Sequence, residues 1–338
     1  MVTPLSLPIS VLDLGSVAGG TTTTEALADT SGLAQAADRL GYHRFWVAEH
    51  HNMPIVASTA PSVLIAHLAA VTERIHIGSG GVMLPNHPPL VVAEQFAMLE
   101  ALHPGRIDLG IGRAPGTDPH TAAALRRGTD TLSAEEFPQH LIDLMGLLGD
   151  PRPGSRLHPR FSATPRATSY PEVFLLGSSG FSAQLAGLLG LSFVQAHHFD
   201  MGGTDESLGL YRQRFQPVGS LAEPYAIVSA NVVVADTEEQ ARRLSFPGRL
   251  VRLWLRSGRP IRLLSVTEAE QHPDLEAALA VPTQSLAGTP DQVVVGLAEL
   301  AERTGADELM ITATTADYAE KLTGLELLAA AVGLTSAA

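Results

Sequence analysis

Cysteine is absent from the sequence of 338 residues. A chain without cysteine forms no disulfide, has no thiolate nucleophile and cannot bind zinc or iron–sulfur clusters through sulfur. The absence does not decide the compartment, because many proteins lack disulfides in both reducing and oxidising environments. Any catalytic or binding site must therefore be built from other side chains.

Positive charge is scarce: 22 Lys and Arg stand against 35 Asp and Glu, which gives a formal net charge of −13. Because the phosphates of DNA and RNA repel a negative chain, nucleic acid is not expected as a main partner. Charged residues of both signs make up only 17% of the chain and hydrophobic residues 45%. This balance indicates a well-buried globular protein, and we do not expect a disordered one.

Signals for secretion and for membrane insertion are also missing. The N-terminus, Met1-Val2-Thr3-Pro4, has no basic stretch of the kind that opens a secretory signal, and we expect a cytoplasmic protein. Residues 174–199 contain no Asp, Glu, Lys or Arg, but several glycines and two histidines interrupt the run. We interpret it as strand, turn, helix and strand in a buried core, and expect no membrane span.

Eight apolar stretches with the composition of β-strands alternate with segments of helical pattern. The expected strands are residues 7–12, 45–47, 75–80, 107–111, 173–176, 192–196, 225–235 and 307–312. Such alternation predicts a parallel sheet, and eight strands close a (β/α)8 barrel. We therefore predict a single barrel domain over residues 1–338 with an insertion after strand seven. A doubly wound sheet is the alternative. Residues 149–171 are expected to form a long loop and residues 246–285 an irregular segment.

A carboxylate and two imidazoles, Glu49, His50 and His51, follow the second expected strand. Parallel α/β folds place their active sites at the carboxyl ends of the strands, which is where these side chains would lie. An imidazole titrates near neutral pH and can take or give a proton. The sequence therefore suggests a catalytic position here, with an ordinary surface pair or hydrogen-bonded strand end as the alternative.

A second candidate, Gly177-Ser178-Ser179-Gly180, lies between the fifth expected strand and a helix. Small residues let the backbone approach a ligand, and the free N–H groups at a helix N-terminus favour an anion. The two hydroxyl groups add hydrogen-bond donors. We interpret the four residues as a phosphate-binding turn, with a tight turn and a serine N-cap as the alternative.

Two further strand ends suggest contact with a ligand. Gly80 and Gly81 follow strand three, where glycine allows a sharp turn or close approach to a flat ligand, unless it marks a packing bulge. Arg113 follows strand four, where a guanidinium can hold an anionic or carbonyl-rich ligand or form a loop salt bridge. The glycines at 110, 112 and 116 fail the spacing of a nicotinamide-binding fingerprint.

The histidines and Glu49 also allow a metal site, because imidazoles with a carboxylate suit zinc or another divalent ion. The candidate ligands are Glu49, His50, His51, His197 and His198. Adjacent histidines on an extended chain point to opposite faces, so His50 and His51 are not expected to share an ion. We predict no metal site. The arginines between residues 249 and 262 are interpreted as a solvated charged loop, with a cationic lid over an anionic ligand as the alternative.

Several motifs together resemble the bacterial-luciferase-like flavin-dependent oxidoreductases, over about residues 7–330. The matching pieces are AEHH at 48–51, GSGGVMLP at 78–85, Glu94-Gln95, PGRIDLGIGR at 104–113, LGSSG at 176–180, GTPDQV at 288–293 and ADELM at 306–310. LGSSG together with AHHF at 196–199 resembles the single-chain branch often labelled group 1, and not a luciferase subunit.

The resemblance implies a (β/α)8 barrel that binds FMN at the strand ends. It implies a monooxygenase that uses O2 and reduced flavin from a separate reductase on a small organic substrate, as a homodimer. By motif, His50 matches the catalytic histidine, and Gly80-Gly81 matches a non-proline cis peptide beside the flavin ring. The flavin-site positions that carry over are Glu49, Arg113, Gly177, Ser178, Ser179 and Gly180.

Three alternatives stay open at this point. One is a deazaflavin-dependent hydride-transfer enzyme of the same superfamily, and another is a flavin-binding protein without turnover. Outside the family, a metal-dependent barrel hydrolase would use Glu49 and the histidines as ligands. The sequence does not identify the substrate, the product, the reductase or the dimer surface.

Overall fold

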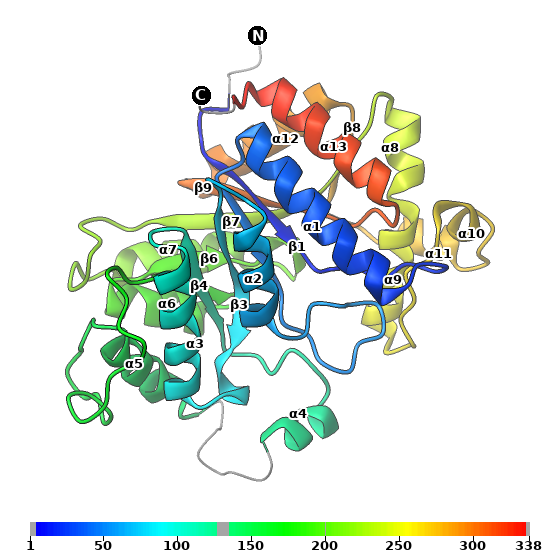
Figure 1. Cartoon of the computed structure of the whole chain (residues 1–338). Helices are drawn as coiled ribbons and strands as arrows, with labels where there is room; N and C mark the ends of the chain where they lie inside the picture. Colours follow the sequence, from blue (N-terminus) through cyan, green and yellow to red (C-terminus); the bar gives the residue numbers. More distant parts are fainter. Residues whose placement is uncertain (1–4, 127–134, 200, 336–338) are drawn as a thin grey trace.

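The computed structural model describes residues 5–126, 135–199 and 201–335, and shows strands that alternate with helices along the chain (Figure 1). The strands are β1 (Ile9–Asp13), β2 (Arg44–Val47), β3 (His76–Met83), β4 (Ile107–Gly112), β5 (Glu172–Gly177), β6 (Ser192–Gln195), β7 (Ala226–Val234), β8 (Leu286–Gly288) and β9 (Glu308–Ala313). The α-helices are α1 (Thr23–Leu40), α2 (Pro61–Ala70), α3 (Pro89–Leu102), α4 (Pro119–Arg126), α5 (Phe137–Leu147), α6 (Gly180–Leu189), α7 (Thr204–Arg214), α8 (Glu238–Leu244), α9 (Phe246–Ser257), α10 (Val266–Glu270), α11 (Leu275–Ala280), α12 (Pro290–Thr304) and α13 (Tyr318–Val332). Two 3-10 helices are η1 (Leu84–Asn86) and η2 (His197–Phe199).

Eight of the strands form a closed cycle of parallel pairs. Strands β1 to β7 pair in sequence order, β7 also pairs with β9, and β9 pairs with β1. The short β8 pairs with the end of β7, outside the cycle. The predicted (β/α)8 barrel with an insertion after strand seven is therefore confirmed, and its eighth barrel strand is β9.

Side chains along each strand alternate between the barrel interior and the helices outside, as pleated backbone requires. On β2, Phe45 and Val47 are fully buried in the large core cluster that also contains the apolar faces of the outer helices. Trp46, between them, belongs to an interior cluster with residues of the other strands: Leu12, Phe174, Val194, Ile227 and Met310. Its ring meets that of Phe174 edge-on, with 4.9 Å between centroids. A packed apolar layer therefore fills the middle of the barrel.

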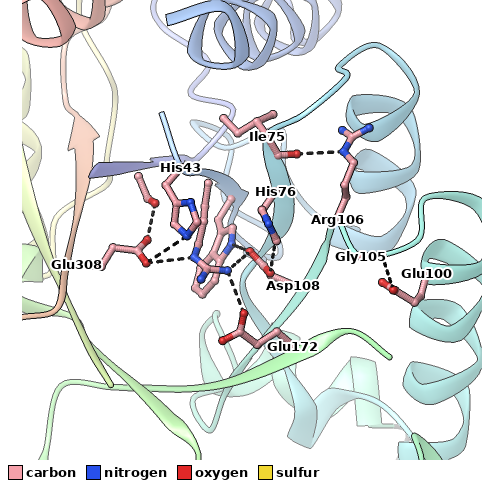
Figure 2. A network of polar contacts seen from close by, with 12 residues as sticks. His43, Ile75, His76, Glu100, Gly105, Arg106, Asp108, Glu172 and Glu308 are labelled. Atoms are coloured by element: carbon pink, nitrogen blue, oxygen red, sulfur yellow. Dashed lines mark hydrogen bonds and ion pairs between the residues drawn. The ribbon is translucent and has the colours of Figure 1, made fainter. Parts of the chain in front are cut away.

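Below this layer, the amino ends of the strands carry a buried charged network (Figure 2). Arg44 Nη1 lies 2.9 Å from Asp108 Oδ2, and Arg44 Nε lies 3.2 Å from Glu308 Oε2. Trp46 Nε1 donates to the same Asp108 oxygen at 2.8 Å. Buried charges are tolerated when they are paired and hydrogen-bonded in this way. The network occupies the amino ends of β2, β4, β5 and β9, on the side of the apolar layer away from the carboxyl ends.

The segment at residues 246–285 was expected to be irregular, and that prediction was wrong. It contains α9, α10 and α11. Phe246, Leu250 and Trp254 follow each other at four-residue spacing, which places them on one face of α9, and all three are buried. The intervening arginines masked this apolar stripe. The loop at 149–171 contains no helix or strand, as expected.

The helices between Gly116 and residue 148 differ in part from those expected. The helix expected at 134–148 is α5, and its first expected residue lies outside the described residues. Helix α4 was not expected in the polar segment after Gly116. In the described ranges, the helices are all too short or too polar to cross a membrane.

Candidate active site

A cavity of about 580 Å³ opens at the carboxyl ends of the barrel strands. Its volume lies within the range of about 300–1,000 Å³ that small-molecule sites occupy. Apolar side chains from the barrel form one part of the lining, among them Leu12, Leu14, Val194 and Met310. Helix α9 of the insertion contributes Val251 and Leu255. The cavity therefore lies at the end of the barrel where enzymes of this fold carry their sites.

His50 lines this cavity three residues after the end of β2. Its backbone N–H donates to Ser58 O at 3.1 Å, and within the described part of the chain its buried Nδ1 has no hydrogen-bond partner. Burial lowers the pKa of His50, and the nearby carboxylate of Glu49 offsets this only in part. The imidazole is therefore neutral at pH 7, with a ring nitrogen available to a ligand.

Glu49 is fully buried and is not among the described residues that line the cavity. Its Oε1 lies 2.8 Å from His51 Nε2 and 2.8 Å from His87 Nε2, and its Oε2 accepts from the Met83 N–H at 3.0 Å. Burial raises the pKa of Glu49, but the hydrogen bonds from His87, His51 and Met83 outweigh it and leave this pKa below the usual value. Glu49 is therefore an ionised anchor that ties the β2 and β3 ends together.

Glu49, His51 and His87 also form the kind of group that can hold a metal ion, because their ligand atoms lie within 4.8 Å of one another. His87, which comes 36 residues after His51, was not predicted to be a site residue. The two imidazole–carboxylate hydrogen bonds account for the arrangement without an ion. None of the three residues is among those that line the cavity within the described ranges. The absence of a metal site stays a prediction.

Gly80 and Gly81 both line the cavity at the end of β3, and the peptide bond between them is cis. A Cβ at Gly81 would lie 2.7 Å from Gly110 O, and one at Gly80 would lie 2.6 Å from a Leu12 methyl group. Glycine is required at both positions, because neighbouring parts of the same chain leave no room for a side chain. The cavity wall here is therefore bare backbone, which suits a flat ligand.

The Gly177–Gly180 turn joins β5 to α6, and Gly177, Ser178 and Ser179 line the cavity. Gly180 is the first residue of α6 and is not among the described lining residues. Ser179 is the N-cap residue, but its hydroxyl makes no capping bond. A serine N-cap normally uses its hydroxyl for that bond. The turn therefore presents serine side chains and a helix N-terminus to the cavity, as an anion site requires.

Arg113 lines the cavity beside this turn, because its guanidinium carbon lies 4.3 Å from the ring centroid of Phe181 in the first turn of α6. Within the described residues, no carboxylate forms an ion pair with it. The loop salt bridge considered from the sequence is therefore not formed within these residues. A positive charge is instead held at the positive end of α6, which favours an anionic ligand there.

Several residues on the opposite wall of the cavity were not predicted from the sequence. His198 was considered as a metal ligand and as part of the AHHF motif, but not as a residue of the flavin site; it lines the cavity, and its Nδ1 lies 2.6 Å from Ser229 Oγ. Asn231, two residues further along β7, lines the cavity too. A signal was present in the sequence: polar residues at 229 and 231 interrupt the apolar β7 at a spacing of two.

Arg249 and Arg252 also line the cavity, but not as a solvated loop. They belong to α9. Arg249 Nη2 donates to Leu279 O at 2.7 Å, and Arg252 Nη2 donates to Pro282 O at 2.9 Å. The interpretation as a solvated charged loop is wrong for these two residues, because they fasten α9 to the segment before β8.

The family model described as luciferase-like monooxygenase matches residues 7–308. The chain belongs to the luciferase-like monooxygenase family. A curated relative from Escherichia coli (strain K12), named luciferase-like monooxygenase, is 41% identical over 336 residues, covering 96% of this chain and 97% of the relative. The uncharacterized protein YvbT of Bacillus subtilis is 42% identical over 325 residues, covering 95% of each chain. The N-acetyl-S-alkylcysteine monooxygenase of the same bacterium is 35% identical over 337 residues, covering 96% and 98%.

Solved structures agree with this membership. Apo-MsnO8 has a TM-score of 0.87 and 35% sequence identity, covering 97% of this chain and 99% of its own. The oxygenating constituent of 3,6-diketocamphane monooxygenase from Pseudomonas putida, solved with FMN, has a TM-score of 0.72 at 20% identity, covering 97% and 98%. The coenzyme F420 dependent tetrahydromethanopterin reductase of Methanopyrus kandleri has a TM-score of 0.66 at 15% identity, covering 95% and 98%. At these identities the last two show the shared fold alone.

Proposed function

We propose that this luciferase-like protein is an FMN-dependent monooxygenase, which uses O2 and reduced FMN from a separate flavin reductase to oxidise a small organic substrate. One observation carries the proposal: a single cavity brings together an anion-binding turn, a wall of bare glycine backbone and a neutral imidazole. These three parts suit the phosphate, the flat ring and the proton transfers of a flavin reaction.

The phosphate is assigned to the turn at the start of α6. Ser178 and Ser179 would donate hydroxyl hydrogen bonds to it, Arg113 would supply a positive charge, and the helix dipole would favour its negative charge. The flat ring is assigned to the backbone of Gly80 and Gly81, where the absence of side chains allows contact over its face. Glu49 would act indirectly, because its hydrogen bond to Met83 N–H holds the end of β3 in place.

His50 is assigned the proton transfers, because it lines the cavity as a neutral imidazole whose buried Nδ1 has no hydrogen-bond partner within the described residues. Bound reduced flavin supplies the two electrons that reduce one oxygen atom of O2 to water, while the other atom enters the substrate. The apolar lining from the barrel and from α9 would keep bulk water away from the reacting groups.

The relatives support this proposal at different levels. The Escherichia coli relative carries the monooxygenase name, and the Bacillus subtilis relative is named for an N-acetyl-S-alkylcysteine. FMN is bound in the diketocamphane enzyme. The fold is also used by an F420-dependent reductase, so a deazaflavin-dependent hydride transfer is the rival within the superfamily. The Ser179 hydroxyl makes no capping bond, which favours a ligand with a phosphate. This feature suits both cofactors and does not separate them.

Anaerobic titration of the purified protein with FMN and with deazaflavin, each oxidised and reduced, tests the proposal. Selective binding of reduced FMN is the expected result, and O2 consumption with a panel of substrates would follow. Selective binding of deazaflavin would replace the proposal with hydride transfer. If neither cofactor binds and one metal ion per chain is found by elemental analysis, the site belongs to a hydrolase. Flavin binding with no turnover on any substrate would favour a flavin-binding protein.

A further inference from the structure

His198 occupies the side of the cavity opposite His50. The two residues follow β6 and β2, which lie four strands apart in the closed cycle of eight. Both side chains line the same cavity, and they are close enough for His50 to influence the ionisation of His198. Any ligand that spans the mouth of the barrel therefore lies between two imidazoles.

A hydrogen-bond relay, in which Ser229 on β7 links His198 to Gln195, fixes the orientation of the His198 ring. Ser229 Oγ lies 3.0 Å from Gln195 O, and a carbonyl oxygen can only accept, so the hydroxyl proton points to Gln195. The same Ser229 Oγ lies 2.6 Å from His198 Nδ1 and has its lone pairs left for that contact. The imidazole must therefore donate through Nδ1–H, which leaves Nε2 without a proton in the neutral ring.

The backbone and the charge state of His198 are held as well. Asn231 Nδ2 donates to His198 O at 2.7 Å, and the ring of Phe199 packs on the imidazole with 4.3 Å between centroids. Burial, with smaller contributions from His197 and His50, lowers the pKa of His198 to about 4. The ring is therefore neutral at pH 7. In the described part of the chain, no group forms a hydrogen bond with its Nε2.

We propose that His198 is a fixed hydrogen-bond acceptor of the site: the Ser229–Gln195 relay holds its imidazole as the Nδ1–H tautomer, and the bare Nε2 accepts from an N–H or O–H of the ligand opposite His50. The inference rests on the proposed function for the identity of that ligand, which is either the reduced flavin ring or the substrate. The tautomer itself does not depend on flavin, so it can be measured in the protein alone.

Two-bond ¹⁵N–¹H correlation spectra of the ¹⁵N-labelled protein at pH 7 test the relay. The chain has 13 histidines, and the signal lost in His198→Gln identifies residue 198. We expect the Nδ1–H pattern in the wild-type protein and a shift towards the Nε2–H form in Ser229→Ala. Thr204→Ala is the matched control, because Thr204 Oγ1 contacts the neighbouring ring at His197 Nδ1, 2.8 Å away. It should leave the His198 signal unchanged. An Nε2–H or protonated ring in the wild-type protein would overturn the proposal.

Reduced FMN, added anaerobically, then separates the two sources of the donor. If its ring supplies the donor, the Nε2 resonance moves and His198→Leu weakens reduced-FMN binding about tenfold, the effect of one hydrogen bond. If neither the resonance nor the affinity changes, the flavin ring is not the donor, and His198→Leu must then lower product formation in the substrate panel; unchanged product formation would overturn the acceptor role. Disagreement between the two measurements contradicts the acceptor role. Failure of FMN to bind the wild-type protein would instead contradict the proposed function and leave the tautomer result standing.

Discussion

Glu49 and His50 are neighbours in the chain, yet they serve different parts of the molecule. The alternation that places Arg44 and Trp46 inside the barrel also places His50 at the cavity, and it turns Glu49 and His51 to the other side. From the sequence, this alternation was considered for His50 and His51 but not for Glu49, which was predicted to be a cofactor-binding position. The geometry agrees with an indirect role, in which Glu49 acts on the site through its hydrogen bonds.

Replacing His50 tests the proton-transfer assignment directly. We expect His50→Ala to lose most turnover, about 100-fold or more for the loss of a general acid–base group, while reduced-FMN affinity changes little. The measurement is a pair: product formation with O2 and anaerobic flavin titration. His67→Ala is the control, because His67 is exposed on α2 and contacts Ser31 far from the cavity. Unchanged turnover in His50→Ala would remove this residue from the mechanism.

Glu49→Gln tests the anchor. The folded pKa of Glu49 lies below its unfolded value, so the ionised side chain contributes stability above about pH 4.3, and that contribution is lost as pH falls through the folded pKa. We expect the variant to lose about 1–3 kcal/mol of unfolding free energy at pH 7 and the difference to shrink below pH 4. Urea unfolding across this pH range measures it. Glu302→Gln, exposed on α12, should stay within about 0.5 kcal/mol of the wild type. A Glu49→Gln deficit that did not change with pH would mean that the carboxylate charge is not what stabilises the cluster.

At the scale of elements, β3 and β4 approach each other where only glycine fits. A Cβ at Gly110 would lie 2.0 Å from Ser79 O, a backbone atom that cannot move aside without disturbing β3. We expect Gly110→Ala to destabilise the protein by about 3 kcal/mol, and the matched change Gly209→Ala to stabilise it slightly. Gly209 is exposed within α7, with open space around its Cα. Thermal unfolding compares the two, and equal melting temperatures would contradict the close approach.

The start of α6 gives a second prediction at this scale. Ser178→Asp places a negative charge where we assign the flavin phosphate, so FMN affinity should fall at least tenfold, or about 1.4 kcal/mol. Riboflavin has no phosphate, and its affinity should change much less. Fluorescence titration with both compounds gives the comparison, and melting temperature shows that the fold is intact. Equal loss for FMN and riboflavin would place the phosphate elsewhere.

Much of this arrangement was accessible from the sequence, because it depends on local patterns. Glycine, serine and histidine residues at the strand ends correctly indicated where the cavity lies, and the cis peptide at Gly80-Gly81 followed from the family motif. His198 and His87 were not recognised as partners of the site, because tertiary pairing brings them to Ser229 and Glu49 across long stretches of chain. Helix α9 was not predicted for a different reason: the arginines between its apolar residues obscured their helical spacing. In the structure, that apolar face packs against α10 and α11.

At the scale of the whole molecule, the barrel followed from the number and alternation of strands, and its extent as one domain over residues 1–338 stays a prediction. The oligomeric state depends on the outer surface, where local patterns carry less information. Helices α2 and α3 are neighbours on the outside of the barrel (Figure 1). They expose four large apolar side chains: Val63 at 70%, Val91 at 43%, Met98 at 53% and Leu102 at 62%. Such a patch on neighbouring elements is typical of an interaction surface.

We therefore expect a homodimer that buries the α2–α3 surface, and we expect Met98→Lys and Leu102→Lys to weaken it. A lysine ammonium buried at an apolar interface without a partner is costly, so the dissociation constant should rise at least about 100-fold, or about 2.8 kcal/mol. Light scattering coupled to size-exclusion chromatography, over a range of concentrations, measures the mass. Leu188→Lys is the control, because Leu188 is 45% exposed on α6, away from these helices. A wild-type monomer at all concentrations would contradict the dimer. Dissociation by Leu188→Lys alone would move the interface to the C-terminal end of α6.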